Sequence, residues 1–387
     1  QVMAINIYQL AEMPILIAIP LFTFAGYLLG ESKAPSRLVR MTDVFLGWMP
    51  GGLAIVAITA CALFTAFTGA SGVTIVALGA LLVPALSKAG YNEKFNLGLV
   101  TSSGSLGLLF APSLPLILYG VVVQQMAIGT TVSIDDLFLA GILPGLLMLV
   151  ALSIYSAFQK TDNPAPNKAF NSKEAWLAIK DSAWEIPLPF IVLGGIYGGF
   201  FAISEAAALT AIYVLTVTVL IRREISFTKL PIVMRDSMKL VGAILLILAV
   251  SIASTNYMID AGIPEQIFDV IQQHITSPIT FLLLLTVFLL ILGMMLDIFS
   301  AIVIMIPILL PIALQYGIHP VHLGILFLAN MQLGYFTPPV GMNLFIASFR
   351  FKKPVTELYI ATIPFFFILL ACVLVITFWP WLSLVFV

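Results

Sequence analysis

The sequence repeats part of its own pattern at a separation of 227 residues. The shared positions are glycines and prolines: Pro84, Gly90, Gly107 and Pro112 recur as Pro311, Gly317, Gly334 and Pro339. These two residue types determine backbone shape, so a repeat that keeps them also keeps the places where regular structure is interrupted. The chain is therefore expected to contain two copies of one backbone pattern.

Composition places this repeat in a membrane. Hydrophobic residues make up 61% of the 387 positions and charged residues only 9%, whereas soluble domains carry roughly 25% charged residues. One globular core cannot hide so much apolar surface, so lipid must solvate much of it. We predict an all-α polytopic membrane protein. A net charge of −1 without basic runs argues against a nucleic-acid partner.

The positions of Lys and Arg assign sides to the connecting segments. Apolar blocks near the ~20 residues that a span needs lie at 8–30, 138–158, 186–200, 204–221, 240–258 and 358–386. Lys and Arg concentrate in 31–43, 87–94, 159–185, 222–239 and 350–357, and are missing from 124–137, 259–278 and 314–322. By the positive-inside rule, the basic loops are cytoplasmic and the others face outward.

This assignment gives the two halves opposite orientations. Residues 45–86 join two inside loops and residues 279–314 join two outside loops, so each is predicted to be a re-entrant hairpin. Residues 95–127 and 323–349 each cross the membrane with a break midway. We therefore predict two inverted repeats, each with one re-entrant hairpin and one broken transmembrane helix. The alternative is that glycine and proline only kink continuous helices.

The predicted domains follow from these assignments. They are a first repeat at 1–158, a cytoplasmic linker at 159–185 with an amphipathic interfacial helix, scaffold helices at 186–239, and a second repeat at 240–387. A plain tether is the alternative for the linker. Because the chain starts at Gln1 without an initiator Met, we expect it to be part of a longer protein.

Matched helix breaks in an apolar chain predict a secondary transporter whose site lies where the repeats meet. The breaks offer hydroxyl and carbonyl oxygens suited to Na⁺ and helix N-termini suited to an anion. No Lys or Arg lies within them, so a carboxylate must be held by N–H, hydroxyl and amide groups. The predicted substrate-binding residues are Ser71, Gly72, Ser105, Ser113, Asp297, Thr337, Gly341 and Asn343.

Asp297 is the acidic residue that lies deep in an apolar segment. An intramembrane carboxylate is a functional candidate, here for Na⁺ binding, proton relay or a substrate hydroxyl. The alternative is a helix N-cap, with Ser300 three residues on. We expect no transition metal and no cofactor, because no Cys or carboxylate residue accompanies the three histidines in a metal-binding pattern. No span carries a hydrolase or transferase motif, so an enzyme is not expected.

Several strings resemble the large membrane subunit of TRAP transporters, the tripartite ATP-independent periplasmic carriers of the ion transporter superfamily. They are FTGASGVTIVALGALL (67–82), SSGSLGLLFAPSLPLILYG (102–120), LGYFTPPVGMNLFIAS (333–348) and the opening PLFTFAGYLLGESKAPSRL (20–38). The resemblance spans essentially the whole chain. One departure is Ala111-Pro112, where members often have two prolines.

The resemblance implies an elevator mechanism driven by Na⁺ in the bacterial inner membrane. It implies two partners, a periplasmic substrate-binding protein and a small four-helix membrane subunit that is separate or fused. It also implies Na⁺ sites at two groups of residues: Gly69, Ser71, Ser103 and Gly107 for one ion, and Asp297, Ser300, Gly334 and Thr337 for a second.

The predicted function is sodium-driven uptake of an organic anion, a carboxylate, that a periplasmic binding protein delivers. The alternative is a self-sufficient sodium/dicarboxylate symporter of the same superfamily that needs no binding protein. The sequence leaves open which carboxylate is carried, because the membrane site is generic for this group.

Overall fold

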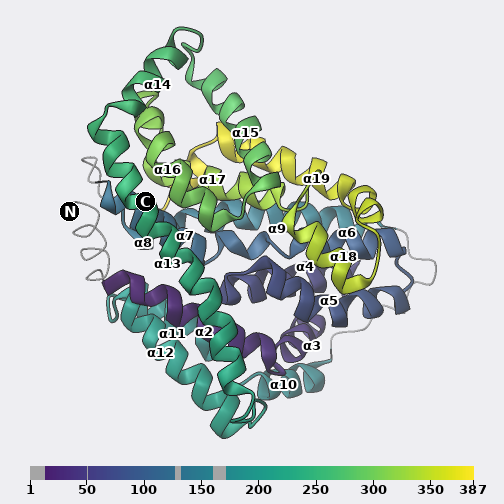
Figure 1. The fold of residues 1–387 in the computed structure, drawn as a ribbon. Helices are drawn as coiled ribbons and strands as arrows, with labels where there is room; N and C mark the ends of the chain where they lie inside the picture. The colour runs from purple at the N-terminus through teal and green to yellow at the C-terminus, as the bar shows by residue number, and fades with distance from the viewer. Residues whose placement is uncertain (1–13, 50, 127–131, 160–170) are drawn as a thin grey trace.

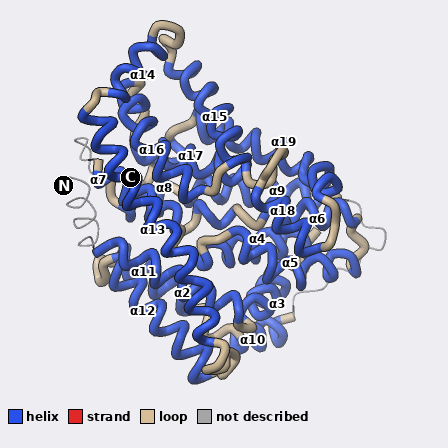
Figure 2. Tube along the Cα trace, viewed as in Figure 1, coloured by secondary structure: helices blue, strands red, loops and turns tan. Residues whose placement is uncertain are grey.

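The structure is a computed structural model that describes residues 14–49, 51–126, 132–159 and 171–387. These residues form helices and connecting loops, without a strand among them (Figure 2). The first half contains η1 (Pro14–Ile17), α2 (Ala18–Glu31), α3 (Ala34–Leu46), α4 (Gly52–Thr68), α5 (Ser71–Lys88), α6 (Glu93–Ser103), η2 (Leu106–Leu109), α7 (Leu114–Gln125), α8 (Ile134–Ala140), α9 (Ile142–Ala157) and α10 (Ser172–Asp181). The second contains α11 (Pro187–Tyr197), α12 (Ile203–Leu215), η3 (Thr216–Ile221), α13 (Leu230–Asp260), α14 (Ile263–Gln272), α15 (Pro278–Met295), α16 (Ile298–Gln315), α17 (Pro320–Gly334), α18 (Met342–Phe351), α19 (Val355–Phe378) and α20 (Trp381–Leu384).

Several of these helices are long and apolar enough to cross a membrane. Six single helical spans meet this test in the described residues, and the pair 93–109 and 114–125, bent by 41°, forms a seventh candidate. The prediction of an all-α polytopic membrane protein is therefore confirmed. The bend also falls inside the predicted broken helix at 95–127.

Helix boundaries repeat at the same separation as the sequence. α5 covers 71–88 and α16 covers 298–315, so both of their ends differ by 227 residues. The peptide bonds before Pro112 and Pro339, which are equivalent positions, are both cis. These matches are consistent with the repeat in the sequence, whereas the division into two inverted repeats stays a prediction.

The two copies interlock. α18 of the second copy packs on α5 of the first, and α7 of the first packs on α16 of the second. Where they meet, the Ser105 hydroxyl donates to the carbonyl of Gln332 at 3.2 Å, and these two residues are themselves 227 positions apart. The hairpins α4–α5 and α15–α16, here called the first and second hairpins, are thus held in one packed body.

A second group of helices lies beside this body. α2 packs on α12 and α13, α11 packs on α12, and α3 packs on α10. In Figure 1, α2, α11 and α12 lie together at one end of the molecule, α14 and α15 lie at the other, and α13 runs along the side between them. The long α13 therefore connects the two regions.

A buried ion cluster fixes α3 to this second group. Arg37 is 8% exposed and pairs with both Glu185 and Glu224, which lie before α11 and α13. Burial alone would lower the pKa of Arg37, but its hydrogen bonds to the two carboxylates raise it above the usual value. Removing one partner of such a cluster leaves a buried charge uncompensated.

The structure corrects the prediction of plain loops at two places. The basic segment 31–43 forms most of the amphipathic α3, and the outward segment 259–278 contains α14. Charge alone assigned the side of each segment, whereas the spacing of its apolar residues decides its conformation. The helix predicted in the linker does form as α10, with Trp176 67% exposed. Its position at the membrane surface stays a prediction, and residues 160–170 of the linker lie outside the described residues.

Candidate functional site

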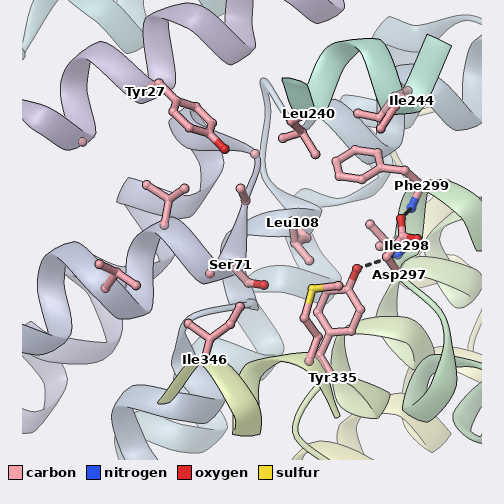
Figure 3. Close-up of a pocket in the computed structure, with 18 of the residues that line it drawn as sticks. Tyr27, Ser71, Leu108, Leu240, Ile244, Asp297, Ile298, Phe299, Tyr335 and Ile346 are labelled. Atoms are coloured by element: carbon pink, nitrogen blue, oxygen red, sulfur yellow. Dashed lines mark hydrogen bonds between the residues drawn. The ribbon is translucent and has the colours of Figure 1, made fainter. Parts of the chain in front are cut away.

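A cavity of about 650 Å³ opens where the two hairpin tips meet the second helix group (Figure 3). One wall consists of residues 69–73 of the first hairpin and 297–299 of the second. Residues of α2 and α13 form the opposite wall, and Tyr335 with α18 closes the cavity between them. The cavity therefore lies between the interlocked repeats and the α2–α13 pair.

Equivalent positions of the two repeats line this cavity with different side chains. The equivalent pairs are Ala70 and Asp297, Ser71 and Ile298, and Leu108 and Tyr335. The first-repeat side chains at these positions are methyl, hydroxyl and aliphatic groups, whereas those of the second repeat are a carboxylate, an aliphatic group and a phenol.

The second hairpin tip satisfies its own helix end. Asp297 is the N-cap of α16, and its Oδ1 accepts hydrogen bonds from the backbone N–H groups of Phe299 and Ser300, both at 3.0 Å. Its Oδ2 accepts the Ser300 hydroxyl. The remaining first-turn N–H, of Ile298, donates to the Tyr335 hydroxyl at 2.5 Å. The capping alternative for Asp297 is confirmed, and the same carboxylate also lines the cavity.

The first hairpin tip leaves its helix end open. Gly69 follows the last residue of α4 and has a φ of +65°, and a Cβ there would lie 2.5 Å from the Leu114 side chain, so glycine is needed at this turn. The N-cap of α5 is Ala70, which has no side chain that could accept a hydrogen bond. Within the described residues, the N–H groups of Ser71, Gly72 and Val73 have no hydrogen-bond acceptor. All three residues line the cavity.

Asn343 connects this open tip to the break of the second repeat. The Ser71 hydroxyl donates to Asn343 Oδ1 at 2.8 Å, and the Asn343 side chain donates to the Thr101 carbonyl at 3.3 Å. The backbone N–H of Asn343 donates to the carbonyl of Tyr335 at 2.9 Å. Ser71 and Asn343, both predicted site residues, are therefore bonded to each other at the cavity wall.

The remaining predicted residues lie around the cavity and do not line it. The hydroxyls of Ser103, Ser113 and Thr337 donate to nearby backbone carbonyls of Leu99, Leu108 and Leu333 at 2.6, 2.5 and 2.7 Å. Gly341, with φ +54°, donates its N–H to the Met294 carbonyl at 3.0 Å. Of the predicted set, Gly69, Ser71, Gly72 and Asp297 line the cavity. The sodium and substrate roles of all the predicted residues stay predictions.

Gly107 and Gly334 have a packing reason to be glycine. A Cβ on Gly107 would lie 2.2 Å from the Ala62 carbonyl of α4, and one on Gly334 would lie 2.6 Å from the backbone of Gly293 in α15. Each broken helix therefore presses against the first helix of its own hairpin at an equivalent point. Neither glycine has a positive φ.

Tyr335 and the cavity wall formed by α2 and α13 were not predicted from the sequence. Tyr335 follows Gly334 inside a break and stands where the first repeat has Leu108. A phenol within a helix break was the available signal, because its hydroxyl requires a polar partner when buried. The contributions of Tyr27 and Leu240 left no sequence signal. Across the described chain, no three His, Cys, Asp or Glu side chains are grouped to hold a metal ion.

Comparison with known proteins gives a family and several relatives. A family described as "Tripartite ATP-independent periplasmic transporter, DctM component" matches residues 1–382. A C4-dicarboxylate TRAP transporter large permease protein from Rhodobacter capsulatus is 33% identical, over 98% of this chain and 88% of that protein. An ectoine/5-hydroxyectoine TRAP transporter large permease protein from Ruegeria pomeroyi is 34% identical over 95% of this chain and 85% of its own length. An isethionate TRAP transporter permease protein, DctMQ, from Oleidesulfovibrio alaskensis is 35% identical over 94% of this chain, which covers 57% of that protein.

Two solved structures share the fold at low sequence identity. The Alcanivorax borkumensis YdaH transporter matches with a TM-score of 0.69 and 15% identity, over 98% of this chain and 87% of that one. Neisseria gonorrhoeae MtrF matches with a TM-score of 0.59 and 13% identity, over 97% of this chain and 82% of that one. Identities this low show the architecture alone.

Proposed function

The chain belongs to the DctM family of tripartite ATP-independent periplasmic transporters, and on this premise we propose that it performs sodium-driven uptake of an organic anion by an elevator movement. It is an integral protein of the inner membrane, and its family consists of transporters rather than enzymes. Large permeases of this family work with a small membrane subunit and a periplasmic binding protein. The same two partners are proposed for this chain.

The open N-terminus of α5 carries the proposal. Among the described residues, three backbone N–H groups without acceptors line the cavity there, and none of the lining side chains is Lys or Arg. A helix N-terminus attracts an anion through these N–H groups and through the helix dipole. The N-terminus of α16 already has Asp297 as its anion. The substrate carboxylate is therefore assigned to α5, with Ser71 beside it.

The cavity position suits an elevator. Its walls come from the interlocked hairpins on one side and from α2 and α13 on the other. If the two hairpins move as one body along α2 and α13, the cavity moves with the wall that the hairpins form. The cavity would then open to the other side of the membrane. If the two repeats are inverted, the inward-open and outward-open states can have the same backbone conformations with the roles of the repeats exchanged. Sodium is proposed as the coupling ion at the eight residues named for it above.

Relatives support an organic acid as substrate. Their names specify C4-dicarboxylate, ectoine, isethionate and 2,3-diketo-L-gulonate. These molecules differ in size, but most carry an acidic group that the open end of α5 would accept. Organic-anion uptake is the function common to this set, and it is the one proposed here.

The test is uptake into proteoliposomes that contain this chain and its small subunit. Labelled substrate should accumulate only with an inward Na⁺ gradient and with the cognate binding protein outside. Accumulation that is equal without the binding protein would replace the proposal with the self-sufficient symporter. Accumulation that is equal with K⁺ in place of Na⁺ would remove sodium as the driving ion.

A further inference from the structure

The break of the second repeat carries groups that reach both hairpin tips. The hydroxyl of Tyr335 accepts the N–H of Ile298 at the second tip, a bond drawn as a dashed line in Figure 3. The carbonyl of Tyr335 accepts the N–H of Asn343 at 2.9 Å. Asn343 Oδ1 in turn accepts the Ser71 hydroxyl of the first tip at 2.8 Å. These three bonds, here called the tip bridge, form a continuous path from one tip to the other.

The tip bridge is the hydrogen-bonded connection between the two tips. Among the described residues, no hydrogen bond joins 69–73 directly to 297–300. The bridge is also shielded from water, since Ser71 is 4% exposed, Tyr335 3% and Asn343 0%. Hydrogen bonds in such an environment are stronger than at a surface, and a buried network makes the elements that it joins rigid. The bridge therefore fixes one tip relative to the other.

The first repeat has no equivalent of these bonds. Leu108 stands where the second repeat has Tyr335, and Leu116 stands where it has Asn343. A leucine side chain offers no hydrogen bond, and the N–H of Ser71 has no acceptor among the described residues. The second repeat alone therefore supplies the bridge, and its contact with the second tip depends on the Tyr335 hydroxyl.

The two ends of the bridge belong to the two proposed sodium sites. Ser71 is part of the first site, and its hydroxyl donates its proton to Asn343, so the lone pairs of its oxygen are left for a cation. The second site combines Asp297 and Ser300 of the hairpin tip with residues of the break. The Tyr335 hydroxyl holds the start of α16 against that break.

We propose that Tyr335 is a positioning residue that couples the two proposed sodium sites, so that an ion at the second tip favours binding of an ion at the first. This inference rests on the proposed function and adds the way in which its two ion sites communicate. An ion in the second site draws the tip and the break together, because its ligands come from both. The bridge then holds Asn343 at the Ser71 hydroxyl, and the first tip loses less conformational freedom when its own ion binds. By linkage, an ion at the first site favours the second by the same factor.

A cysteine at the first tip reports on this coupling. Ala70→Cys places a thiol on the cavity wall next to Ser71, whereas the two native cysteines are buried. The purified membrane complex is labelled with N-ethylmaleimide at increasing Na⁺, and the Na⁺ concentration that halves the labelling rate measures occupation of the first site. Ser300→Ala weakens the second site. It should raise this half-labelling concentration by at least ~5-fold, the lower end of typical coupling between sites.

Removing the bridge should remove this effect. Tyr335→Phe deletes the hydroxyl and keeps the ring, and in its background Ser300→Ala should change the half-labelling concentration by less than ~2-fold. A role of the ring in packing alone would leave the ~5-fold effect in place. If gel filtration shows that Tyr335→Phe does not fold, Asn343→Ala interrupts the same path at its other end and should give the same result.

The matched control is Tyr119→Phe. The Tyr119 phenol is also fully buried, and it bonds the carbonyl of Pro320 outside the cavity. The ~5-fold effect of Ser300→Ala should persist in this variant.

The outcomes separate the inference from the proposed function. If Na⁺ slows labelling but Ser300→Ala has no effect at the first tip, or acts equally with and without the Tyr335 hydroxyl, the inference fails and the proposed function stands. If Na⁺ does not slow labelling in the Ala70→Cys protein itself, the sodium role in the proposed function fails, and the inference fails with it.

Discussion

The two hairpin tips use one backbone shape for opposite purposes. In the first, Ala70 leaves the N-terminus of α5 without a side-chain cap, and three N–H groups line the cavity. In the second, Asp297 and Tyr335 occupy every first-turn N–H of α16. Both helices begin at equivalent positions, 71 and 298. The two tips thus share one backbone shape, whereas their side chains leave one helix end without a cap and place a carboxylate at the other.

The largest expected effect comes from disrupting the close packing of a broken helix against the first helix of its hairpin. Gly334→Ala places a Cβ 2.6 Å from the backbone of Gly293, so α17 and α15 must separate. We expect a loss of about 3 kcal/mol in unfolding free energy and, with it, lower uptake. The thermal unfolding midpoint of the detergent-solubilised protein measures this change. Gly242→Ala is the control, since a Cβ added there would meet open space beyond its own stretch of helix. Equal midpoints for the two variants would show that the contact at Gly334 is loose.

The comparison is tested directly by making the first tip resemble the second. Ala70→Asp places a carboxylate cap on α5, in the backbone geometry of an N-cap. Substrate affinity should fall by at least ~10-fold, or 1.4 kcal/mol, because the N–H groups become occupied and a negative charge stands at the anion site. The apparent Km of uptake measures this loss. An unchanged Km would place the substrate carboxylate away from α5.

The reverse change removes the cap from the second tip. Asp297→Ala leaves the N–H groups of Phe299 and Ser300 without their acceptor and should cost about 1–2 kcal/mol of stability. Asp297→Asn should cost less than ~0.5 kcal/mol, because Asn caps almost as well. Denaturation midpoints distinguish the two. We also expect transport to fall strongly in Asp297→Ala, and full uptake by that variant would reduce Asp297 to its capping role.

The smallest effect concerns the bond between the tips and the second break. Ser71→Ala removes the donor to Asn343 Oδ1, and about 1 kcal/mol of stability should be lost. Ser153→Ala is a suitable control, since its hydroxyl bonds only within its own helix, to Leu149. Thermal midpoints again compare the pair. A larger loss in Ser153→Ala would show that the contact with Asn343 adds nothing to stability.

Much of the frame was predictable because local rules govern it. Glycines located the first tip, glycines and prolines located both breaks, and the Asp297–Ser300 interruption located the second tip. Three of the predicted apolar blocks, 138–158, 204–221 and 358–386, coincide with helices long enough to span a membrane. Asp297 was identified from the sequence because an acidic residue deep in an apolar segment is energetically costly and is therefore a functional candidate. The basic segment that became α3 was misjudged as a loop, since charge reports the side of a membrane and not the conformation of the backbone.

The site itself was predictable only in part. Gly69, Ser71, Gly72 and Asp297 do line one cavity, whereas the hydroxyls of Ser103, Ser113 and Thr337 donate to nearby backbone carbonyls four or five residues earlier in the chain. A hydroxyl in a helix break is a ligand candidate by type, but its direction depends on which neighbouring carbonyl it reaches. That choice is made by packing.

The sequence by itself determined that this chain is a helical membrane protein, because its apolar composition requires lipid around it. The repeated glycines and prolines also predicted the helix breaks, because these residues act on the backbone locally. Tertiary structure alone decided which helices face each other across the cavity. α2 and α13 form a wall, Tyr335 reaches the N-terminus of α16, and Asn343 joins Ser71, each over a long separation in sequence. Such contacts depend on how the two units interlock, and interlocking is settled by side-chain packing over the whole body rather than by any local pattern.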